Sequence, residues 1–231
     1  MHRSSSILKS QLTLTQYVEG LAHETISLKP RLSLVHVGDM PDHVFFVRSG
    51  WAYRFQLLGD GRRQIFSFYT AGDLVMPGFL LAPQSHYSLM AITSGEALMI
   101  PRQAMVKGMA ENQELLEAVL QMIAFQQRYM DERMVELGRL TAYERVCVLI
   151  ARLASRLNHM GEDTLVPLTR DLISDALGIT SVHTSRTLKL LEDQGVVRWD
   201  RQSLQVLDLQ KVKDAVPRGF HVHSEMPPHL I

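Results

Sequence analysis

Four polar side chains and one valine recur at spacings of three and four residues between positions 181 and 189. They are Ser181, Val182, Ser185, Arg186 and Lys189. Residues with these spacings share one face of an α-helix. An arginine on such a face can donate two hydrogen bonds to guanine O6 and N7, and a valine can contact a thymine methyl group. The pattern therefore predicts a helix face with the chemistry to read base edges in DNA.

The surrounding residues, 169–194, have the pattern of a helix-turn-helix that would position this face. Thr169 and Thr180 can each cap the start of a helix, and Gly178 can adopt the left-handed conformation that the turn between the helices requires. The inward positions are Leu172, Ile173, Ala176 and Leu177 in the first helix and Thr184, Thr187, Leu188 and Leu191 in the second. Ordinary helical hairpins share this pattern, so a second feature is needed to decide between the two.

A hairpin pattern directly after the two helices is that second feature. Two short strand-like runs, 196–199 and 204–207, are separated by the polar turn 200–203. A helix-turn-helix followed by a hairpin is a winged helix, and Arg198 and Arg201 of the wing can reach phosphates beside the groove. The predicted DNA-contacting residues are Thr169, Arg170, Thr180, Ser181, Val182, His183, Ser185, Arg186, Lys189, Arg198 and Arg201.

The composition of the chain restricts how it could bind DNA. Its 231 residues contain 24 basic and 24 acidic side chains, so the formal net charge is zero. Any affinity for DNA must therefore come from a local cluster of basic residues.

No apolar run approaches the roughly 20 residues that a membrane helix needs, and no signal peptide is recognisable. We therefore expect a cytoplasmic protein without a membrane partner. Cys147 is the only cysteine, which excludes an intramolecular disulfide, and its apolar neighbours predict that it is buried.

Residues 34–100 differ from the C-terminal part in composition and in the spacing of their apolar residues. Short runs rich in Val, Phe, Tyr and Trp alternate with Gly-Asp and Asp-Gly turns. The runs at 44–47, 51–58, 64–69, 87–92 and 97–100 predict a small antiparallel barrel or roll. The fold class predicted for the whole chain is α+β, with an N-terminal antiparallel β-roll, a long helix and a C-terminal winged helix.

A long helix is predicted between residues 111 and 138, because no proline or glycine interrupts 111–137. Its apolar positions alternate spacings of four and three, which is a heptad seam formed by Leu116, Leu120, Ile123, Gln127, Met130, Met134 and Leu137. The seam could pack on the roll of its own chain, but the length of the helix and its polar flanks, Arg133 among them, favour a two-stranded coiled coil. Gln127 would help to fix the register of such a coil.

The predicted domain organisation follows from these elements. A β-roll domain occupies residues 1–110, a dimerisation helix 111–138, a winged helix 139–216 and a tail 217–231. Gly138 marks a hinge, and Thr141 caps a further helix that extends to about Leu157. His221 and His223 in the tail could bind a metal, although paired histidines in a tail seldom do. We expect no metal site and no bound cofactor.

Roll, long helix, hinge and winged helix, in this order, resemble the Crp/Fnr family of bacterial transcription regulators. The resemblance runs from about Leu34 to Val216. Its most specific parts are 50–52 with 61–65, the Ala-Gly-Asp-Leu turn at 71–74, and 177–188. The resemblance implies a homodimer that binds a two-fold-related DNA site and contacts RNA polymerase, and whose roll receives a signal. It also implies that the protein is not an enzyme.

Several positions of the roll depart from the best-known members of this family. Members that bind cyclic AMP have a glutamate after the Gly-Asp turn and an Arg-Ser or Arg-Thr pair further on. Here these positions hold Pro77 and the pair Tyr87-Ser88. Without that arginine a buried phosphate would lose a charge-assisted contact, so we expect no cyclic-nucleotide binding of the familiar kind. A small-molecule effector of unknown identity stays possible.

Two further sensor chemistries of the family find little support in this sequence. Oxygen-sensing members have an N-terminal cysteine cluster, which this chain does not contain. Haem-binding members use histidine ligands, and His36, His43 and His86 are the available candidates.

A rival hypothesis makes the roll a cupin-like, metal-dependent enzyme domain. Such domains usually carry a His-x-His pair on one strand, and the predicted strands lack one.

The recognition helix departs from the familiar pattern too. In those members a glutamate precedes the arginine by four residues. Arg186 matches the arginine, whereas the glutamate position holds Val182. We therefore predict a half-site that keeps the guanine and differs nearby, with half-sites about 10–10.5 base pairs apart. Ser181, His183 and Ser185 are candidates for base or phosphate contacts, and Arg170 and Lys189 for phosphate contacts.

Overall fold

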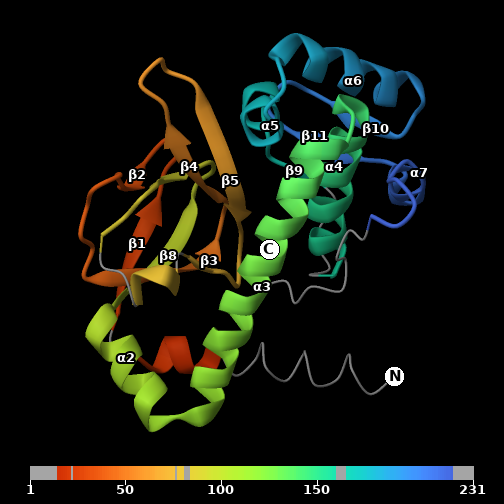
Figure 1. Cartoon of the computed structure of the whole chain (residues 1–231). Coiled ribbons are helices and arrows are strands. Elements are labelled where there is room, and N and C mark those ends of the chain that lie inside the picture. Colours follow the sequence, from red (N-terminus) through yellow and green to blue (C-terminus); the bar gives the residue numbers. More distant parts are fainter. Residues whose placement is uncertain (1–14, 22, 76, 81–83, 160–164, 221–231) are drawn as a thin grey trace, which may run out of the picture. The chain divides into compact units, whose positions relative to one another are not determined.

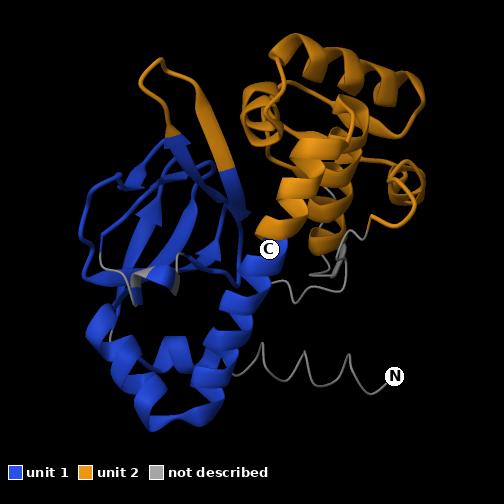
Figure 2. Ribbon diagram, viewed as in Figure 1, with its two compact units in different colours: residues 1–56, 66–129, 229–231 blue, residues 57–65, 130–228 orange. Residues whose placement is uncertain are grey.

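The computed structural model describes residues 15–21, 23–75, 77–80, 84–159 and 165–220. They form two compact units, which Figure 2 distinguishes by colour. Unit 1 comprises residues 1–56, 66–129 and 229–231, and unit 2 comprises residues 57–65 and 130–228, to the extent that these are described. Each unit is considered by itself below. Within the described residues, none of the helices combines the length and the apolar character needed to cross a bilayer.

Unit 1 contains the predicted antiparallel roll, made of two four-stranded sheets (Figure 1). One sheet has the order β1-β8-β3-β6 and the other the order β2-β7-β4-β5. The strands are β1 (Glu24–Leu28), β2 (Ser33–Val35), β3 (His43–Ser49), β4 (Ala52–Leu57), β5 (Arg63–Tyr69), β6 (Leu74–Val75), β7 (Ser88–Ala91) and β8 (Gly95–Pro101). The core lies between the sheets, where Phe45, Leu89 and Leu98 are almost completely buried.

Close backbone approach explains one of the motif glycines. Gly50 joins β3 to β4 with a φ of 83°, and a Cβ atom there would lie 2.6 Å from the carbonyl oxygen of Ser94. Only glycine fits this position without displacing the neighbouring turn. The Gly-Trp-Ala motif at 50–52 therefore reflects the geometry of the roll.

The N-terminal part of the chain corrects one prediction. The sequence pattern predicts strands only from residue 34 onward. Residues 15–20 are helical, but Glu24–Leu28 form β1, which pairs with β8 along five residues. The sequence Glu-Thr-Ile-Ser-Leu alternates polar and apolar residues, which is the usual pattern of a half-exposed strand. The strand predictions began ten residues too late.

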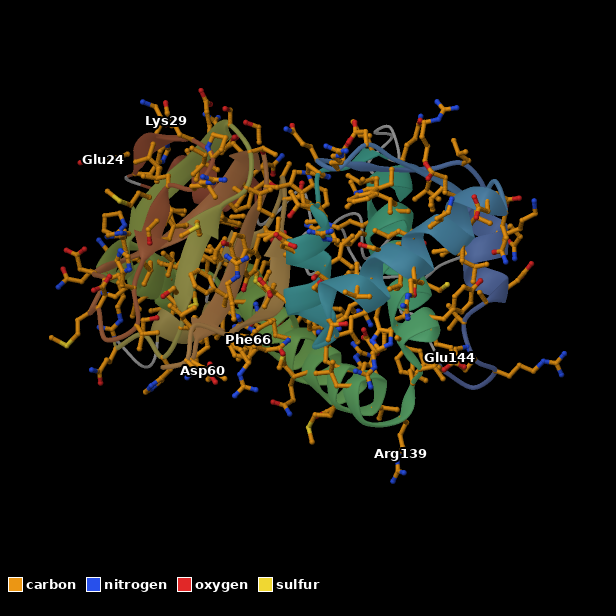
Figure 3. The ribbon with its side chains drawn as sticks, turned by 90° about the horizontal axis from the view of Figure 1, so that it is seen from above. Glu24, Lys29, Asp60, Phe66, Arg139 and Glu144 are labelled. Carbon is orange, nitrogen blue, oxygen red and sulfur yellow. The ribbon has the colours of Figure 1, made fainter. Side chains whose placement is uncertain are left out.

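The long helix differs in its start from the prediction. The short helix α2 (Arg102–Glu111) ends before α3 (Gln113–Arg139) begins, so the helical region is two elements joined at Asn112. The Asn112 side chain caps the start of α3 by accepting a hydrogen bond from the backbone N–H of Leu115 at 2.9 Å. At the other end of α3, Arg139 is exposed and points away from the helix, as Figure 3 shows.

Helix α4 (Ala142–His159) follows the predicted hinge. Thr141 and Glu144 cap its start reciprocally: the Thr141 backbone N–H donates to Glu144 Oε2 at 2.7 Å, and the Glu144 backbone N–H donates to Thr141 Oγ1 at 3.3 Å. The apolar side chains Val146, Leu149, Ile150 and Leu153 of α4 are buried, and Cys147 is buried, as predicted. Burial raises the pKa of the Cys147 thiol to about 11, which makes it unreactive at neutral pH.

The rest of unit 2 is the predicted winged helix. Its elements are β9 (Leu165–Val166), α5 (Arg170–Leu177), α6 (Ser181–Asp193), β10 (Val197–Trp199), β11 (Leu204–Val206) and α7 (Leu209–Asp214). The hairpin β10–β11 gains a third strand, because β9 pairs with β11. The sequence analysis did not predict β9 or α7. The predicted α+β fold with roll, long helix and winged helix is confirmed.

Candidate DNA-binding interface

Local hydrogen bonds define the helix-turn-helix as the sequence predicts. Thr169 Oγ1 accepts from the backbone N–H of Leu172 at 3.3 Å, and Thr180 Oγ1 accepts from that of His183 at 3.3 Å. Gly178 ends α5 in the left-handed conformation with a φ of 62°, and its N–H donates to the carbonyl of Ser174. The two threonine caps and the glycine turn are confirmed as structural roles.

A buried hydroxyl pair connects the two helices of the motif. Ser174 Oγ of α5 lies 2.9 Å from Thr184 Oγ1 of α6, and both side chains are buried. Each hydroxyl also bonds to a backbone carbonyl four residues earlier, at Arg170 and Thr180 respectively. The predicted inward positions Thr187, Leu188 and Leu191 are buried as well. The sequence analysis placed Thr184 inward but missed Ser174 as its partner.

The opposite face of α6 is open to solvent. Val182, His183, Arg186 and Lys189 are exposed, with 57% of Val182 accessible, while Ser181 and Ser185 are half-buried. Arg186 forms no hydrogen bond or ion pair with any of the described residues. Its guanidinium group is therefore available to an external acceptor. The valine next to it presents a methyl surface at the same end of the helix.

Neighbouring carboxylates partly engage the other cations. Arg170 Nε lies 3.4 Å from Asp171 Oδ1, and Lys189 Nζ lies 3.4 Å from Asp193 Oδ1. Both pairs are exposed, and exposed ion pairs contribute little and exchange easily. Arg170 Nη1 also lies 3.5 Å from Ser185 Oγ, which brings the start of α5 beside the outer face of α6.

The wing is fixed at its tip by an aspartate. Asp200 Oδ1 accepts hydrogen bonds from the backbone N–H groups of Gln202 and Ser203 and from the Ser203 hydroxyl, at 2.8–3.0 Å. These bonds hold the pKa of Asp200 below its ordinary value. Arg201 lies within this turn, has a φ of 80° and is exposed, as is Arg198. The wing therefore presents both of its predicted arginines to solvent.

Several cationic or amide groups hold the last carbonyls of α5. Arg133 Nη2 and Gln64 Nε2 donate to the carbonyl of Ala176, the latter at 3.1 Å, and Arg145 Nη1 donates to that of Leu177 at 3.2 Å. Positive charge at a helix C-terminus also offsets the negative end of the helix dipole. These contacts fix the turn that orients α6. They could not be predicted from the sequence, because the donors are distant in the chain.

A buried ionic cluster lies next to these contacts. The Glu136 side chain is completely buried; its Oε1 lies 2.5 Å from Arg133 Nη1 and its Oε2 lies 3.3 Å from Arg152 Nη1. Arg133 and Arg152 are only 4% and 1% exposed. Arg133 was expected on the polar flank of a coiled coil, and that expectation is wrong, because its guanidinium group joins α3 to α4 and α5 inside unit 2.

The predicted dimer seam faces away from the buried side of α3. Leu116, Leu120 and Met134 are 38%, 54% and 72% exposed, Gln127 is exposed, and Ile123, Met130 and Leu137 are half-buried. The residues of α3 that are buried against the chain itself are Leu115, Ala118, Val119, Met122, Phe125, Tyr129, Arg133 and Glu136. Four of the seven seam residues, Leu116, Leu120, Gln127 and Met134, are therefore exposed within the described chain.

The histidines considered for haem or metal binding lie at the end of β3 and in two loops. The Nδ1 atom of His43 lies 2.8 Å from Asp42 Oδ1, and the loops of His36 and His86 are joined by backbone hydrogen bonds between Gly38 and Ser85 and between Ser85 and Asp39. Among the described residues, no group of three or more His, Cys, Asp or Glu is arranged to hold a metal ion. His221 and His223, like the side chain of Pro77, lie outside what the structure describes.

Comparison with known proteins supports the two-part architecture. Residues 25–112 match the cyclic nucleotide-binding domain family, and residues 144–215 match the Crp-like helix-turn-helix domain family. The nitrogen fixation regulation protein FixK of Azorhizobium caulinodans is 32% identical over 181 residues, which cover 72% of each chain. The chain belongs to the Crp/Fnr family. It is therefore a DNA-binding regulator of the Crp/Fnr type.

Similarity to other proteins supports the same family assignment. FixK of Rhizobium meliloti is 28% identical over 169 residues, which cover 73% of this chain and 75% of the relative. The solved structure of FixK2 from Bradyrhizobium japonicum superposes with a TM-score of 0.77 at 25% identity and covers 86% of this chain and 100% of that chain. The similarity to FixK2 covers most of both units of this chain.

Proposed function

We propose that the protein is a homodimeric transcription regulator that reads an inverted-repeat DNA site with α6. The observation that carries the proposal is the outer face of α6, where Arg186 is exposed without a partner among the described residues and Val182 is exposed beside it. Arg186 would donate to guanine O6 and N7, and Val182 would contact a thymine methyl. The protein would act by binding and not by catalysis.

The remaining candidate residues would position the helix on the duplex. Thr169 and Thr180 lie at helix N-termini, where backbone N–H groups can bind phosphate. Arg170, Lys189, Arg198 and Arg201 would contact phosphates on either side of the groove, and Ser181, His183 and Ser185 would contact bases or phosphates. Because phosphate contacts depend on salt, affinity should fall as ionic strength rises.

The test of this proposal is selection of bound sequences from a random DNA library with the purified full-length protein at a stated salt concentration. We expect an enriched inverted repeat with a guanine in each half-site and half-sites about 10–10.5 base pairs apart. The selection is repeated with cell extract, in case DNA binding requires an effector. Absence of any enriched sequence in both selections would contradict the proposal.

We also propose that the α3 seam forms the dimer interface, since it exposes apolar side chains at heptad spacing. Leu120→Glu places a charge in the seam and should convert the dimer to a monomer in sedimentation analysis. Gln121→Glu is the matched control, because Gln121 is an exposed neighbour on the same helix. A Leu120→Glu protein that stays dimeric would place the interface elsewhere.

We expect the protein to regulate transcription in the way that the Crp/Fnr family does. In the cytoplasm, a dimer bound beside a promoter would contact RNA polymerase, and the roll would receive a small-molecule signal. Tyr87 and Ser88 occupy the places of the Arg-Ser pair, which argues against a cyclic nucleotide held in the familiar way. Calorimetric titration of the full-length protein with cyclic AMP tests this point, and we expect no saturable binding.

A further inference from the structure

A single arginine is buried inside the roll of unit 1. Arg54 lies on β4, where it pairs with Leu89 of β7, and only 9% of its surface is exposed. Its guanidinium carbon lies 4.6 Å from the centre of the Tyr87 ring and 5.7 Å from that of the Phe66 ring. Figure 3 labels Phe66 among the side chains of the roll. Arg54 Nη2 donates to Ser67 Oγ at 3.4 Å, which is a long bond.

The positive charge of Arg54 has no carboxylate partner among the described residues. An arginine does not lose its proton at physiological pH, and a buried charge without a counter-ion costs several kcal/mol. Aromatic faces offset part of this cost through cation–π contacts. The side chain of Tyr87 also forms a hydrogen bond with Arg54, but Arg54 Nε has no acceptor among the described residues.

A second buried donor belongs to the same interior. The Tyr69 hydroxyl is buried and also has no hydrogen-bond partner among the described residues. Burial raises the pKa of Tyr69 to about 12, although the charge of Arg54 acts in the opposite direction. The phenol is therefore protonated at neutral pH and can donate. Arg54 Nη2 donates to Ser67 Oγ, and Tyr69 lies two residues after Ser67 on β5, so both β5 side chains are on the same buried face of that strand. The two groups therefore share one region of the roll.

We propose that Arg54 and Tyr69 form a binding site for the carboxylate or phosphate group of a small molecule in the interior of the roll. The anion would accept from Arg54 Nε and from the Tyr69 hydroxyl and would neutralise the buried charge. The ring of Tyr87 would orient the guanidinium group from one side. This inference rests on the proposed role of the roll as signal receiver and names the class of ligand.

The proposal reverses part of the conclusion drawn from the sequence. Tyr87 stands where cyclic-nucleotide-binding relatives have the arginine of the Arg-Ser pair, so the sequence indicates a lost phosphate contact. The structure shows a positive charge in contact with that same tyrosine but contributed by β4. A ligand held by Arg54 would consequently be recognised through a different strand, and a cyclic nucleotide need not fit.

The site also reaches the long helix. Tyr129 of α3 is buried, and its phenol acts electrostatically on both Arg54 and Tyr69. The next residue, Met130, belongs to the predicted dimer seam. An anion bound to Arg54 would therefore change the charge near Tyr129.

The test is calorimetric titration of the full-length protein at constant ionic strength with inorganic phosphate, acetate and cyclic AMP as separate probes. We expect saturable binding of phosphate or acetate with one site per chain. Arg54→Met and Tyr69→Phe should each weaken that binding roughly ten- to hundredfold, because each removes one charge-assisted hydrogen bond. Arg48→Met is the control, since Arg48 is an exposed arginine of the same roll that pairs with Glu19.

The outcomes separate the hypotheses. Tyr69→Phe removes only a hydroxyl group, so it tests the site even if Arg54→Met does not fold. Equal binding in wild type and Tyr69→Phe, or no saturable binding of phosphate or acetate, would overturn the proposal. Cyclic AMP binding that is unchanged by both substitutions would also overturn the proposal. It would show that a cyclic nucleotide binds without Arg54 and Tyr69. The library selection is independent of these titrations, so the DNA-binding proposal can stand if this one fails.

Discussion

Arginines have opposite roles in two regions of unit 2. On the outer face of α6 and in the wing, Arg186, Arg198 and Arg201 are exposed. At the junction of α3 and α4, Arg133 and Arg152 are buried and paired with Glu136. The first group would be available to DNA because none of the described residues forms an ion pair with it. The second group fixes the framework that holds α6, because a buried charge needs its partner.

The largest expected effect is a loss of stability when the buried cluster of Arg133, Glu136 and Arg152 is disrupted. Glu136→Gln removes the charge that pairs with both arginines, and leaves Arg152 with the more distant carboxylate of Glu132 at 3.9 Å. We expect the free energy of unfolding to fall by about 3–5 kcal/mol, measured by urea denaturation. Glu117→Gln is the control, because Glu117 is exposed on the same helix and should change stability by less than about 0.5 kcal/mol. Equal effects of the two substitutions would remove the distinction between the regions.

At the exposed side, Arg186→Ala should leave stability nearly unchanged and affect binding to DNA. We expect a loss of about 1–3 kcal/mol at the matched guanine and a relaxed preference at that base pair. The measurement is a binding titration with the selected site and with the site changed at that guanine. Lys107→Ala, which removes an exposed cation from α2, should leave both titrations unchanged. A retained guanine preference in Arg186→Ala would assign the reading to another residue.

The hydroxyl pair between α5 and α6 lies between these extremes, since it is buried but uncharged. Ser174→Ala and Thr184→Val should each destabilise the protein by about 1 kcal/mol. In the double variant the loss of stability should be smaller than the sum of the two single losses, because each single variant already lacks the shared hydrogen bond. A double-mutant cycle in urea measures this coupling. Strict additivity would mean that the pair does not connect the two helices energetically.

The smallest effect concerns the wing. The backbone N–H groups of Ser203 and Gln202 hold the pKa of Asp200 below its value in the unfolded chain. The resulting stabilisation is complete above the unfolded pKa, near pH 4, and is lost as the pH falls through the lower folded value. Asp200→Asn should lessen the dependence of the thermal midpoint on pH in this acidic range. The same pH dependence in both proteins would show that Asp200 does not contribute.

Patterns within a few residues were predicted well from the sequence. The caps at Thr169, Thr180 and Thr141 and the turn at Gly178 depend on hydrogen bonds over three or four residues, so the order of residues is sufficient to find them. The strand β1 was missed although its alternation is visible, because its pairing partner β8 lies some seventy residues further along. The long helix was predicted from residue 111, and α3 begins at Gln113, after the Asn112 cap. The short helix α2 was not predicted.

The sequence by itself determined the fold class, the family and the helix face that would meet DNA. Each depends on periodicity, caps and turn residues, which act locally. Only the tertiary structure decided which charges are buried and what they contact: Arg133 inside unit 2 and Arg54 inside the roll. Burial and pairing depend on residues that are distant in the chain and meet only when the chain has folded, so residue type alone could not distinguish these arginines from Arg186.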